Sequence, residues 1–254
     1  MVRITVQKSE ETKKFYDDLV EGKVSRALWG KERRFSPEAI AAKQSVFKYF
    51  TSVVARFLSK SDSVLDLGCG PGGFLSLVAP LCGQVTGADI APNFVDECNN
   101  LIEEKHLSNA SALLIRPGVL PFRSGSFDRI IVVDTVHHLE NTTETFGEVS
   151  RVLKKEGLLL IFEPNKLNPA LLVMCCLDRN EHGLLRLGTR KKYRELLGGR
   201  YDIVADEYNG LLIGPKSHVS LFLADVFNSS MLSPILGWLS PKIFIVARKR
   251  QSAS

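Results

Sequence analysis

Hydrophobic and polar residues follow two different patterns along the chain. Up to about residue 60, apolar positions recur at helical spacing between charged residues, which predicts a helical N-terminal cap over residues 1–60. From Val64 onward, short β-type apolar runs alternate with helical windows. This alternation is typical of a mostly parallel sheet with helices on both faces. The pattern therefore predicts an α/β domain over residues 61–254.

Five apolar runs are expected to form parallel strands. They cover residues 63–67, 84–88, 112–115, 128–133 and 157–162. Helices are expected over residues 72–80, 92–105 and 142–153, the last of them starting with the capping-box spacing of Asn141 and Glu144. Two later runs, 201–208 and 242–249, come without a regular helix between them. We expect them to close the sheet as an antiparallel pair.

Two segments interrupt this order, at about residues 165–200 and 209–241. Both contain dense apolar stretches punctuated by Pro, Gly and Asn, such as ALLVMCCL and MLSPILGWL. We expect these insertions to form an apolar lid over the carboxyl edge of the sheet, enclosing a largely hydrophobic pocket. The alternative is that they pack a dimer interface or a small core of their own.

Length and composition fit one large domain. The chain has 254 residues, of which 44% are hydrophobic, and 33 Lys plus Arg against 28 Asp plus Glu give a formal net charge of +5. This length and apolar content suffice for a sizeable core. The basic residues are scattered apart from three short clusters, which are typical of solvated faces. No nucleic-acid partner is therefore expected.

The sequence predicts neither a secretory leader nor a membrane span. The first residues lack the apolar core of a signal peptide, and no stretch reaches the roughly 18 to 20 apolar residues of a spanning helix. We therefore expect a cytoplasmic protein, with peripheral membrane contact left open. Zinc spacing and CxxC pairs are lacking, so we expect no metal site, and reduced thiols in or near the core at Cys69, Cys82, Cys98, Cys175 and Cys176.

A glycine-rich turn follows the first strand, in the stretch SVLDLGCGPGGFLSLV. Gly68, Gly70 and Gly73 have the spacing of a dinucleotide fingerprint, and Asp89 lies about 20 residues further on. Asp66 argues against a dinucleotide, because a carboxylate at the mouth of the turn would repel the phosphates. It suits a ligand with positive charge near the turn and a ribose for Asp89 to bind. S-adenosylmethionine has these groups.

Four stretches, in correct order and spacing, resemble the type-11 branch of the class I S-adenosylmethionine-dependent methyltransferases. They are VLDLGCGPGGF, VTGADIAP, LPFRSGSFDRIIVVDTVHHLEN and EVSRVLKKEGLLLIFEPN, and they span about residues 63–165. The resemblance implies S-adenosylmethionine as the cofactor. It also implies a Rossmann-like seven-stranded, mostly parallel sheet whose last strand is antiparallel, which the closing pair predicted above fits.

The resemblance assigns roles to residues of the turn and of the second strand. Asp66 would hold the methionine end of the cofactor, largely through its amino group. Gly68, Gly70 and Gly72 would let the backbone pass close beneath the cofactor, and Asp89 would bind the ribose hydroxyls.

This chain departs from the family where an Asp binds the adenine amino group. The residue at that position is Arg116, and an arginine cannot accept a hydrogen bond. Backbone carbonyls near Pro117 and Val119 would then hold the adenine, or the ring would pack against Ile90. The loss of one hydrogen bond affects affinity more than the identity of the ligand.

Methyl transfer requires alignment of donor and acceptor more than a fixed catalytic set. Candidates lie after the fourth strand, because ligands of open α/β sheets bind at the carboxyl ends of strands. Asp134 is expected at the cofactor, and His137 and His138 are candidates for proton transfer. For either histidine the alternative is shaping the pocket or satisfying backbone groups.

Five further residues are weaker candidates. They are Tyr16 in the cap, His182 and His218 in the insertions, and Glu163 and Asn165 at the end of the fifth strand. Each has a structural alternative, such as packing or surface exposure.

The sequence thus predicts a methyltransferase acting on an O or C nucleophile of a small, hydrophobic or lipid-like acceptor. The apolar insertions favour that acceptor class. A protein or RNA methyltransferase and a non-catalytic S-adenosylmethionine-binding scaffold are the alternatives.

Overall fold

The structure is a computed structural model that describes residues 13–15, 18, 44–177, 182–209, 218, 222, 226 and 237–251. Tyr16, most of the expected N-terminal cap and most of the insertion at 209–241 lie outside these residues.

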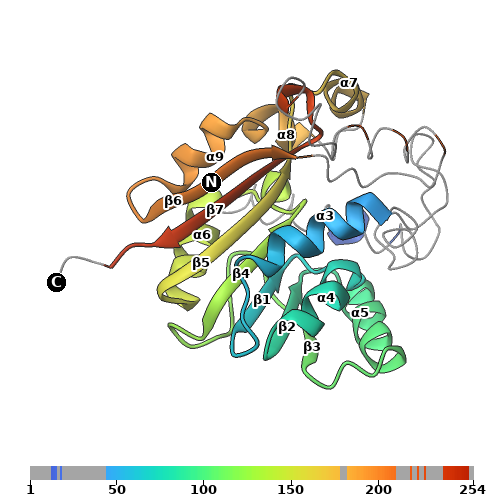
Figure 1. Ribbon diagram of the computed structural model, residues 1–254, viewed down its shortest axis with the longest axis vertical. Coiled ribbons are helices and arrows are strands. Elements are labelled where there is room, and N and C mark those ends of the chain that lie inside the picture. The colour runs from blue at the N-terminus through green and yellow to red at the C-terminus, as the bar shows by residue number, and fades with distance from the viewer. Residues whose placement is uncertain are drawn as a thin grey trace.

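Within the described part of the chain, seven strands form one sheet in the order β3-β2-β1-β4-β5-β7-β6 (Figure 1). The strands are β1 Ser63–Leu67, β2 Gln84–Asp89, β3 Ala110–Leu114, β4 Phe127–Val133, β5 Leu153–Pro164, β6 Tyr201–Asn209 and β7 Lys242–Lys249. The first five pair in parallel, whereas β7 runs antiparallel to both β5 and β6. The predicted Rossmann-like, mostly parallel sheet with an antiparallel last strand is confirmed.

Helices cover both faces of the sheet (Figure 1). One face carries α3 (Gln44–Ala55), α4 (Gly73–Val78) and α5 (Pro92–Glu104), and the other carries α6 (Thr142–Val152) and α9 (Arg190–Leu197). Two further helices, α7 (Pro169–Leu177) and α8 (His182–Leu187), lie at the carboxyl edge of the parallel strands. The predicted cap of α6 is present, since Asn141 Oδ1 accepts a hydrogen bond from the Glu144 backbone N–H at 3.1 Å.

Helix α3 lies at the end of the segment expected to form the N-terminal cap, and it packs into the core of the sheet domain. Its apolar residues Phe50, Val53, Val54 and the following Phe57 have i, i+3, i+4, i+7 spacing and so form one face. Phe50 and Val54 are fully buried, and the Phe50 ring lies 4.6 Å from that of Phe74 in α4. The last helix before β1 therefore belongs to the same hydrophobic core as the sheet.

The segment at 165–200 has two parts with different surroundings. In α9, Tyr193 and Leu197 are one helical turn apart and both are buried against the sheet beside α6. In α7, by contrast, Cys176 is exposed, so the expectation of a thiol in or near the core is wrong for this residue. The stretch PALLVMCCL is apolar on all sides, and one buried face cannot hold all of its side chains.

Candidate cofactor site

The turn between β1 and α4 contains three glycines in the left-handed region. Gly68, Gly70 and Gly72 have φ of 76°, 51° and 85°. A Cβ on Gly68 would lie 2.1 Å from Thr135 Oγ1, and one on Gly72 would lie 2.7 Å from Cys98 Sγ. Gly68 and Gly72 are therefore required for close packing against the loop after β4 and against α5. At Gly70 glycine is favoured by the backbone angle alone.

Asp89, the last residue of β2, holds two turns together. Its Oδ2 accepts a hydrogen bond from the Gly70 N–H at 2.9 Å, and its Oδ1 accepts one from the Ala91 N–H at 3.0 Å. The carboxylate thus connects the glycine turn to the start of α5. Each carboxylate oxygen has two lone pairs and can accept more than one hydrogen bond, which is the chemistry that binding of ligand hydroxyl groups requires.

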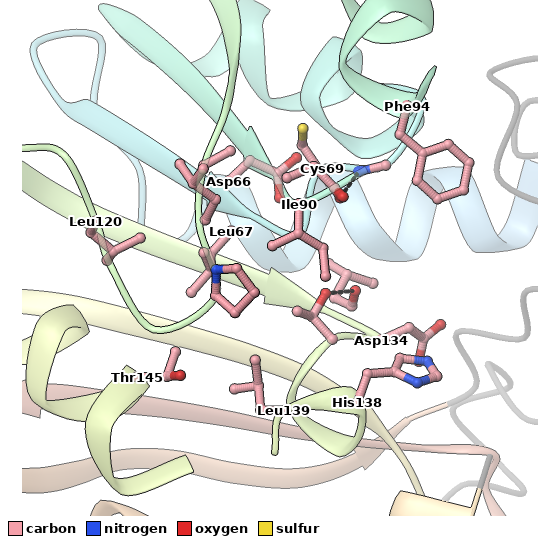
Figure 2. A pocket seen from close by; sticks show the side chains of 18 of the residues that line it. Asp66, Leu67, Cys69, Ile90, Phe94, Leu120, Asp134, His138, Leu139 and Thr145 are labelled. Carbon is pink, nitrogen blue, oxygen red and sulfur yellow. Dashed lines mark hydrogen bonds between the residues drawn. The ribbon is translucent and has the colours of Figure 1, made fainter. Parts of the chain in front are cut away.

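A cavity of about 470 Å³ opens between these turns and the residues that follow β4. Figure 2 shows Asp66, Ile90 and Phe94 on one side of it and His138 and Leu139 on the other. The predicted site residues that line the cavity are Asp66, Gly68, Gly70, Asp89, Ile90, Pro117, Val119, Asp134 and His138. Gly72 and His137 are not among the described residues that line it.

Asp66 is the most distinctive group on the cavity wall. It is 2% exposed, and its Oδ2 has no hydrogen-bond partner within the part of the chain that the structure describes. Loss of hydration, and secondarily the charge of Asp89, raise the pKa of Asp66 to about 7. Buried carboxylates are normally paired, so this one is suited to a cationic ligand group.

Glu163, near the end of β5, fixes the loop that follows β4. Its Oε1 accepts hydrogen bonds from the backbone N–H groups of Thr135 and Val136, each at 2.7 Å. Its Oε2 lies 2.6 Å from His137 Nδ1 and 3.4 Å from the Tyr193 hydroxyl. One fully buried carboxylate therefore sets the course of the loop that carries Asp134 and the two histidines.

The two histidines differ in their surroundings. His137 is 3% exposed and is held by Glu163, whereas His138 is partly exposed and lines the cavity. Their rings lie 3.9 Å apart between centroids. Of the two histidines predicted as candidates, His138 is therefore the one that lines the cavity, and its ring contacts that of His137.

Asp134 has φ of 52°, a left-handed angle that non-glycine residues rarely adopt. Its N–H donates to the Phe162 carbonyl at 2.9 Å, and its Oδ1 is paired with Lys242 Nζ. Lys242 begins β7 and is buried. The antiparallel last strand therefore contributes a cation that neutralises a carboxylate on the cavity wall.

The segment after β3 forms another part of the wall. Pro117, Gly118 and Val119 line the cavity, and the Arg116 carbonyl accepts a hydrogen bond from the Val119 N–H at 3.1 Å. The Arg116 side chain is exposed and is not among the lining groups described. The departure from the family at this position therefore leaves backbone and apolar groups at the wall.

A pair on α6 holds the same segment in place. Glu148 Oε2 accepts from the Leu120 N–H at 3.1 Å, and Arg151 donates to the carbonyls of Leu120 and Phe122. The hydrogen bond from Arg151 lowers the pKa of Glu148 to about 2. Helix α6 thereby sets the position of the wall beside β3.

The remaining candidates lie elsewhere. Asn165 is buried and bonds to the backbone of the segment before β7, so it supports the fold next to the site. His218 is exposed, and the side chain of His182 lies outside the described residues. Sequence reasoning missed the lining residues Phe94, Thr135, Leu139, Glu140 and Thr145. Of these, only Thr145 could have been inferred from the sequence, because it falls in the first turns of the helix predicted over residues 142–153.

The strand order and the position of the cavity define a class of protein. A mostly parallel sheet with an antiparallel last strand, and a glycine turn that opens at the carboxyl end of β1 beside an Asp whose Oδ2 has no partner among the described residues, are the features of a class I methyltransferase fold.

Comparison with known proteins agrees with this class. Residues 65–161 match the type-11 family, described as a methyltransferase domain. The tRNA (carboxymethyluridine(34)-5-O)-methyltransferase alkbh8 of Xenopus tropicalis is 33% identical over 108 residues, 41% of this chain and 16% of that protein. The sterol 4-C-methyltransferase strm-1 of Caenorhabditis elegans is 28% identical over 112 residues, 44% of this chain and 34% of that protein.

A demethylmenaquinone methyltransferase of Tropheryma whipplei is 33% identical over 106 residues, 42% of this chain and 43% of that protein. The matched region thus covers less than half the length of each of these relatives.

Solved structures show the same fold over most of the chain. A SAM-dependent methyltransferase from Aquifex aeolicus has a TM-score of 0.59 at 16% identity, covering 84% of this chain and 98% of that one. Phosphoethanolamine N-methyltransferase 2 of Haemonchus contortus, in complex with S-adenosyl-L-methionine, has a TM-score of 0.61 at 19% identity, covering 87% and 59%. Residues 65–161 therefore match a methyltransferase domain, and the chain shares the fold of solved S-adenosylmethionine-dependent methyltransferases.

Proposed function

We propose that the protein is an S-adenosylmethionine-dependent methyltransferase acting on an oxygen or carbon nucleophile of a small, hydrophobic or lipid-like acceptor. The observation that carries the cofactor assignment is Asp66. Its buried, unpartnered oxygen and raised pKa mark a place for a cation on the wall of the cavity. The family match and the fold support the same cofactor.

The cavity walls fit the parts of this cofactor. Asp66 would pair with its amino group, and the backbone at Gly68 and Gly70 would pass beneath it. Asp89 would accept hydrogen bonds from the ribose hydroxyls, since each of its oxygens can accept more than one. Ile90 and the backbone between Pro117 and Val119 would enclose the adenine, where Arg116 supplies no acceptor.

The bound cofactor supplies a methyl group on a sulfonium, which is already a good leaving group. The protein then has to align donor and acceptor and exclude water, and alignment alone contributes several kcal/mol, on the order of 7 in well-oriented intramolecular reactions. His138 is placed to accept a proton from an acceptor that enters protonated. His137 and Glu163 would act as positioning residues for it.

The acceptor class is supported by the sequence and by two relatives. The apolar segments at 165–200 and 209–241 each begin where a strand, β5 or β6, ends at the carboxyl edge of the sheet. The Caenorhabditis and Tropheryma relatives are named for a sterol and a demethylmenaquinone as their acceptors. The name of the Xenopus relative favours a tRNA acceptor as the second candidate.

Two experiments test this proposal. Calorimetric titration with S-adenosylmethionine, S-adenosylhomocysteine and NAD should give micromolar binding of the first two and no binding of NAD. Incubation of the protein with methyl-labelled S-adenosylmethionine and a cell extract, followed by separation into organic, RNA and protein fractions, should place the label in the organic fraction. Label in the RNA fraction would overturn the acceptor class, and binding of NAD alone would overturn the cofactor.

A further inference from the structure

Several apolar side chains that face solvent gather around α7. They are Leu167, Leu172, Val173 and Trp238, which we call the α7 patch. Val173 is 60% exposed and Trp238 is 54% exposed, although both are side chains that proteins normally cover. The nine residues of α7, PALLVMCCL, include no charged side chain. A concentration of exposed apolar groups of this kind marks an interaction surface.

Two buried asparagines join Trp238 to α7. Asn165 Nδ2 donates to the Trp238 carbonyl at 2.8 Å and to the Ser240 carbonyl at 2.9 Å. Asn168 Nδ2 donates to the Leu239 carbonyl at 2.6 Å, and its Oδ1 accepts from the Leu171 N–H in the first turn of α7 at 3.1 Å. The backbone turn that carries Trp238 is therefore fixed against α7, so this exposed indole is held on a rigid support.

Two cations lie on segments that adjoin the patch, Lys166 just before α7 and Arg186 in α8, which contacts α7. Lys166 donates to the Leu185 carbonyl at 2.9 Å and Arg186 donates to the Leu139 carbonyl at 2.8 Å. Each of these hydrogen bonds goes to a neutral carbonyl group, which does not neutralise the positive charge of the side chain. Lys166 directly precedes Leu167 of the patch.

An open hollow beside Leu167 adds to this charge. Its ionisable lining residues are Arg190, Lys191, Arg194 and Glu195. Asp206 pairs with both arginines, and Glu195 lies 2.7 Å from Lys192 Nζ and 4.0 Å from Lys191 Nζ. With Lys166, Arg186 and Lys192 included, six cations of the described part of the chain stand against two anions, Asp206 and Glu195, so this surface complements a negatively charged partner.

We propose that the α7 patch docks the protein on the surface of an anionic lipid bilayer. The aliphatic side chains would enter the boundary between headgroups and acyl chains, with Trp238 at headgroup level, where indoles are favoured. The basic residues would face anionic headgroups, which attract each nearby cation. The patch thus has both the apolar and the electrostatic parts of an interfacial attachment site.

Docking in this way would have a consequence for the reaction. Helix α7 lies at the carboxyl edge of the sheet (Figure 1), and residues that follow β1, β2 and β4 at that same edge line the cofactor cavity. A protein attached through α7 would therefore turn the cavity edge toward the membrane, which supplies lipid-like acceptors. Only this consequence rests on the proposed function, because attachment itself needs neither cofactor nor acceptor.

Flotation of the full chain with vesicles tests the proposal. We expect the protein to float with vesicles of phosphatidylcholine and phosphatidylglycerol, and more weakly with phosphatidylcholine alone. Val173→Glu should weaken binding by roughly tenfold or more, because a valine that enters the bilayer boundary is replaced by a charge. Val204→Glu is the matched control, since Val204 is an exposed valine, at 44%, on β6 outside the patch.

Tryptophan fluorescence gives an independent reading. The chain has two tryptophans, Trp29 and Trp238. In the Trp29→Phe variant, emission from Trp238 should shift to the blue on addition of anionic vesicles and should be quenched by brominated acyl chains. Unchanged emission in the presence of bound vesicles would mean that another surface binds, which would overturn the proposal.

Other outcomes are equally decisive. Equal loss of binding in Val173→Glu and Val204→Glu, or no flotation of the unmodified chain, would overturn the docking site. A dimer in sedimentation analysis that Val173→Glu dissociates would assign the patch to a second copy instead. Val173→Glu should bind S-adenosylmethionine as tightly as the unmodified chain does. If the proposed function is wrong, the unmodified chain would fail to bind S-adenosylmethionine but would still bind vesicles.

Discussion

Among single residues, Asp66 has the clearest link between environment and role. Its carboxylate lies at the carboxyl end of β1, out of water and near Asp89. Both influences favour the neutral form and raise the pKa of Asp66 to about 7. A bound ammonium group would favour the ionised form instead, so cofactor binding and proton release at this residue are linked.

This linkage predicts a pH-dependent affinity. Below about pH 7 the free site is protonated, and binding of a cation must release that proton, so affinity for S-adenosylmethionine should fall by up to roughly tenfold per pH unit. Above about pH 7 the affinity should level off. Calorimetry in two buffers of different ionisation enthalpy should show proton release at about pH 6 and none at about pH 8.5. An affinity that stays constant across this range would contradict the role of Asp66.

The pair of Lys242 and Asp134 predicts a measurable coupling. Lys242→Met removes the cation from a mostly buried carboxylate and should lower the free energy of unfolding by about 2 kcal/mol, less than for a fully buried pair. The double variant Asp134→Asn/Lys242→Met should be more stable than Lys242→Met alone, because no charge is left unpaired. Urea unfolding of Lys242→Met, Asp134→Asn and the double variant measures the coupling. Additive losses would mean that the two side chains act independently.

At the scale of elements, α8 packs on the turn that follows β4 through a glycine. A Cβ on Gly183 would lie 1.6 Å from the His137 carbonyl oxygen, so Gly183→Ala should push α8 away and cost about 2 to 3 kcal/mol. Gly147 in α6 is the control, because no described atom lies within 4 Å of the position that a Cβ would take there. Gly147→Ala should stabilise the protein by about 0.5 to 1 kcal/mol. Equal effects in urea unfolding would contradict the packing of α8.

Helices and strands were predictable where a periodic pattern of apolar residues coincided with a local signal such as a helix cap. All seven strands coincide with apolar runs of the sequence, and α6 begins directly after Asn141, its predicted N-cap. The role of α9 was not predictable, because Tyr193 and Leu197 stand in a segment as rich in charge as a solvated helix. Only tertiary packing shows that this helix covers the sheet.

The site was predictable to the extent that residues adjoin the strand ends. Asp66, Asp89 and His138 follow from the order of strands and from the family resemblance, and they line the cavity. The anchoring of the loop by Glu163 and the ion pair from Lys242 depend on contacts between residues far apart in sequence. No spacing along the chain encodes such contacts.

At the scale of the whole molecule, the carboxyl edge of the sheet collects the features that point to function. The cofactor cavity, the loop with His138 and the α7 patch all lie there (Figure 1). Within the described ranges, no helix combines the length and the apolar content that a membrane span requires. The central claim is that a cavity at this edge binds a cationic cofactor through Asp66.

The most direct test compares two aspartates at opposite ends of β1. Asp66 lacks a described partner for Oδ2, whereas the Oδ2 of Asp62 accepts from the Ser59 N–H at 2.7 Å and lies 3.4 Å from Arg129 Nε. In the unfolded chain Asp66 ionises near the ordinary aspartate pKa of 3.8, while in the folded protein it keeps its proton up to about pH 7. Between these values stability falls as pH rises, so Asp66 makes the ligand-free fold less stable at neutral pH.

We would therefore measure S-adenosylmethionine binding by calorimetry and thermal unfolding at about pH 8 for Asp66→Asn and Asp62→Asn. The account predicts that Asp66→Asn loses cofactor binding yet stabilises the ligand-free protein, on the order of 1 to 3 kcal/mol. Asp62→Asn should destabilise the protein and retain binding, because it removes a paired buried carboxylate away from the cavity. Normal cofactor binding by Asp66→Asn, or its loss together with destabilisation, would contradict the account.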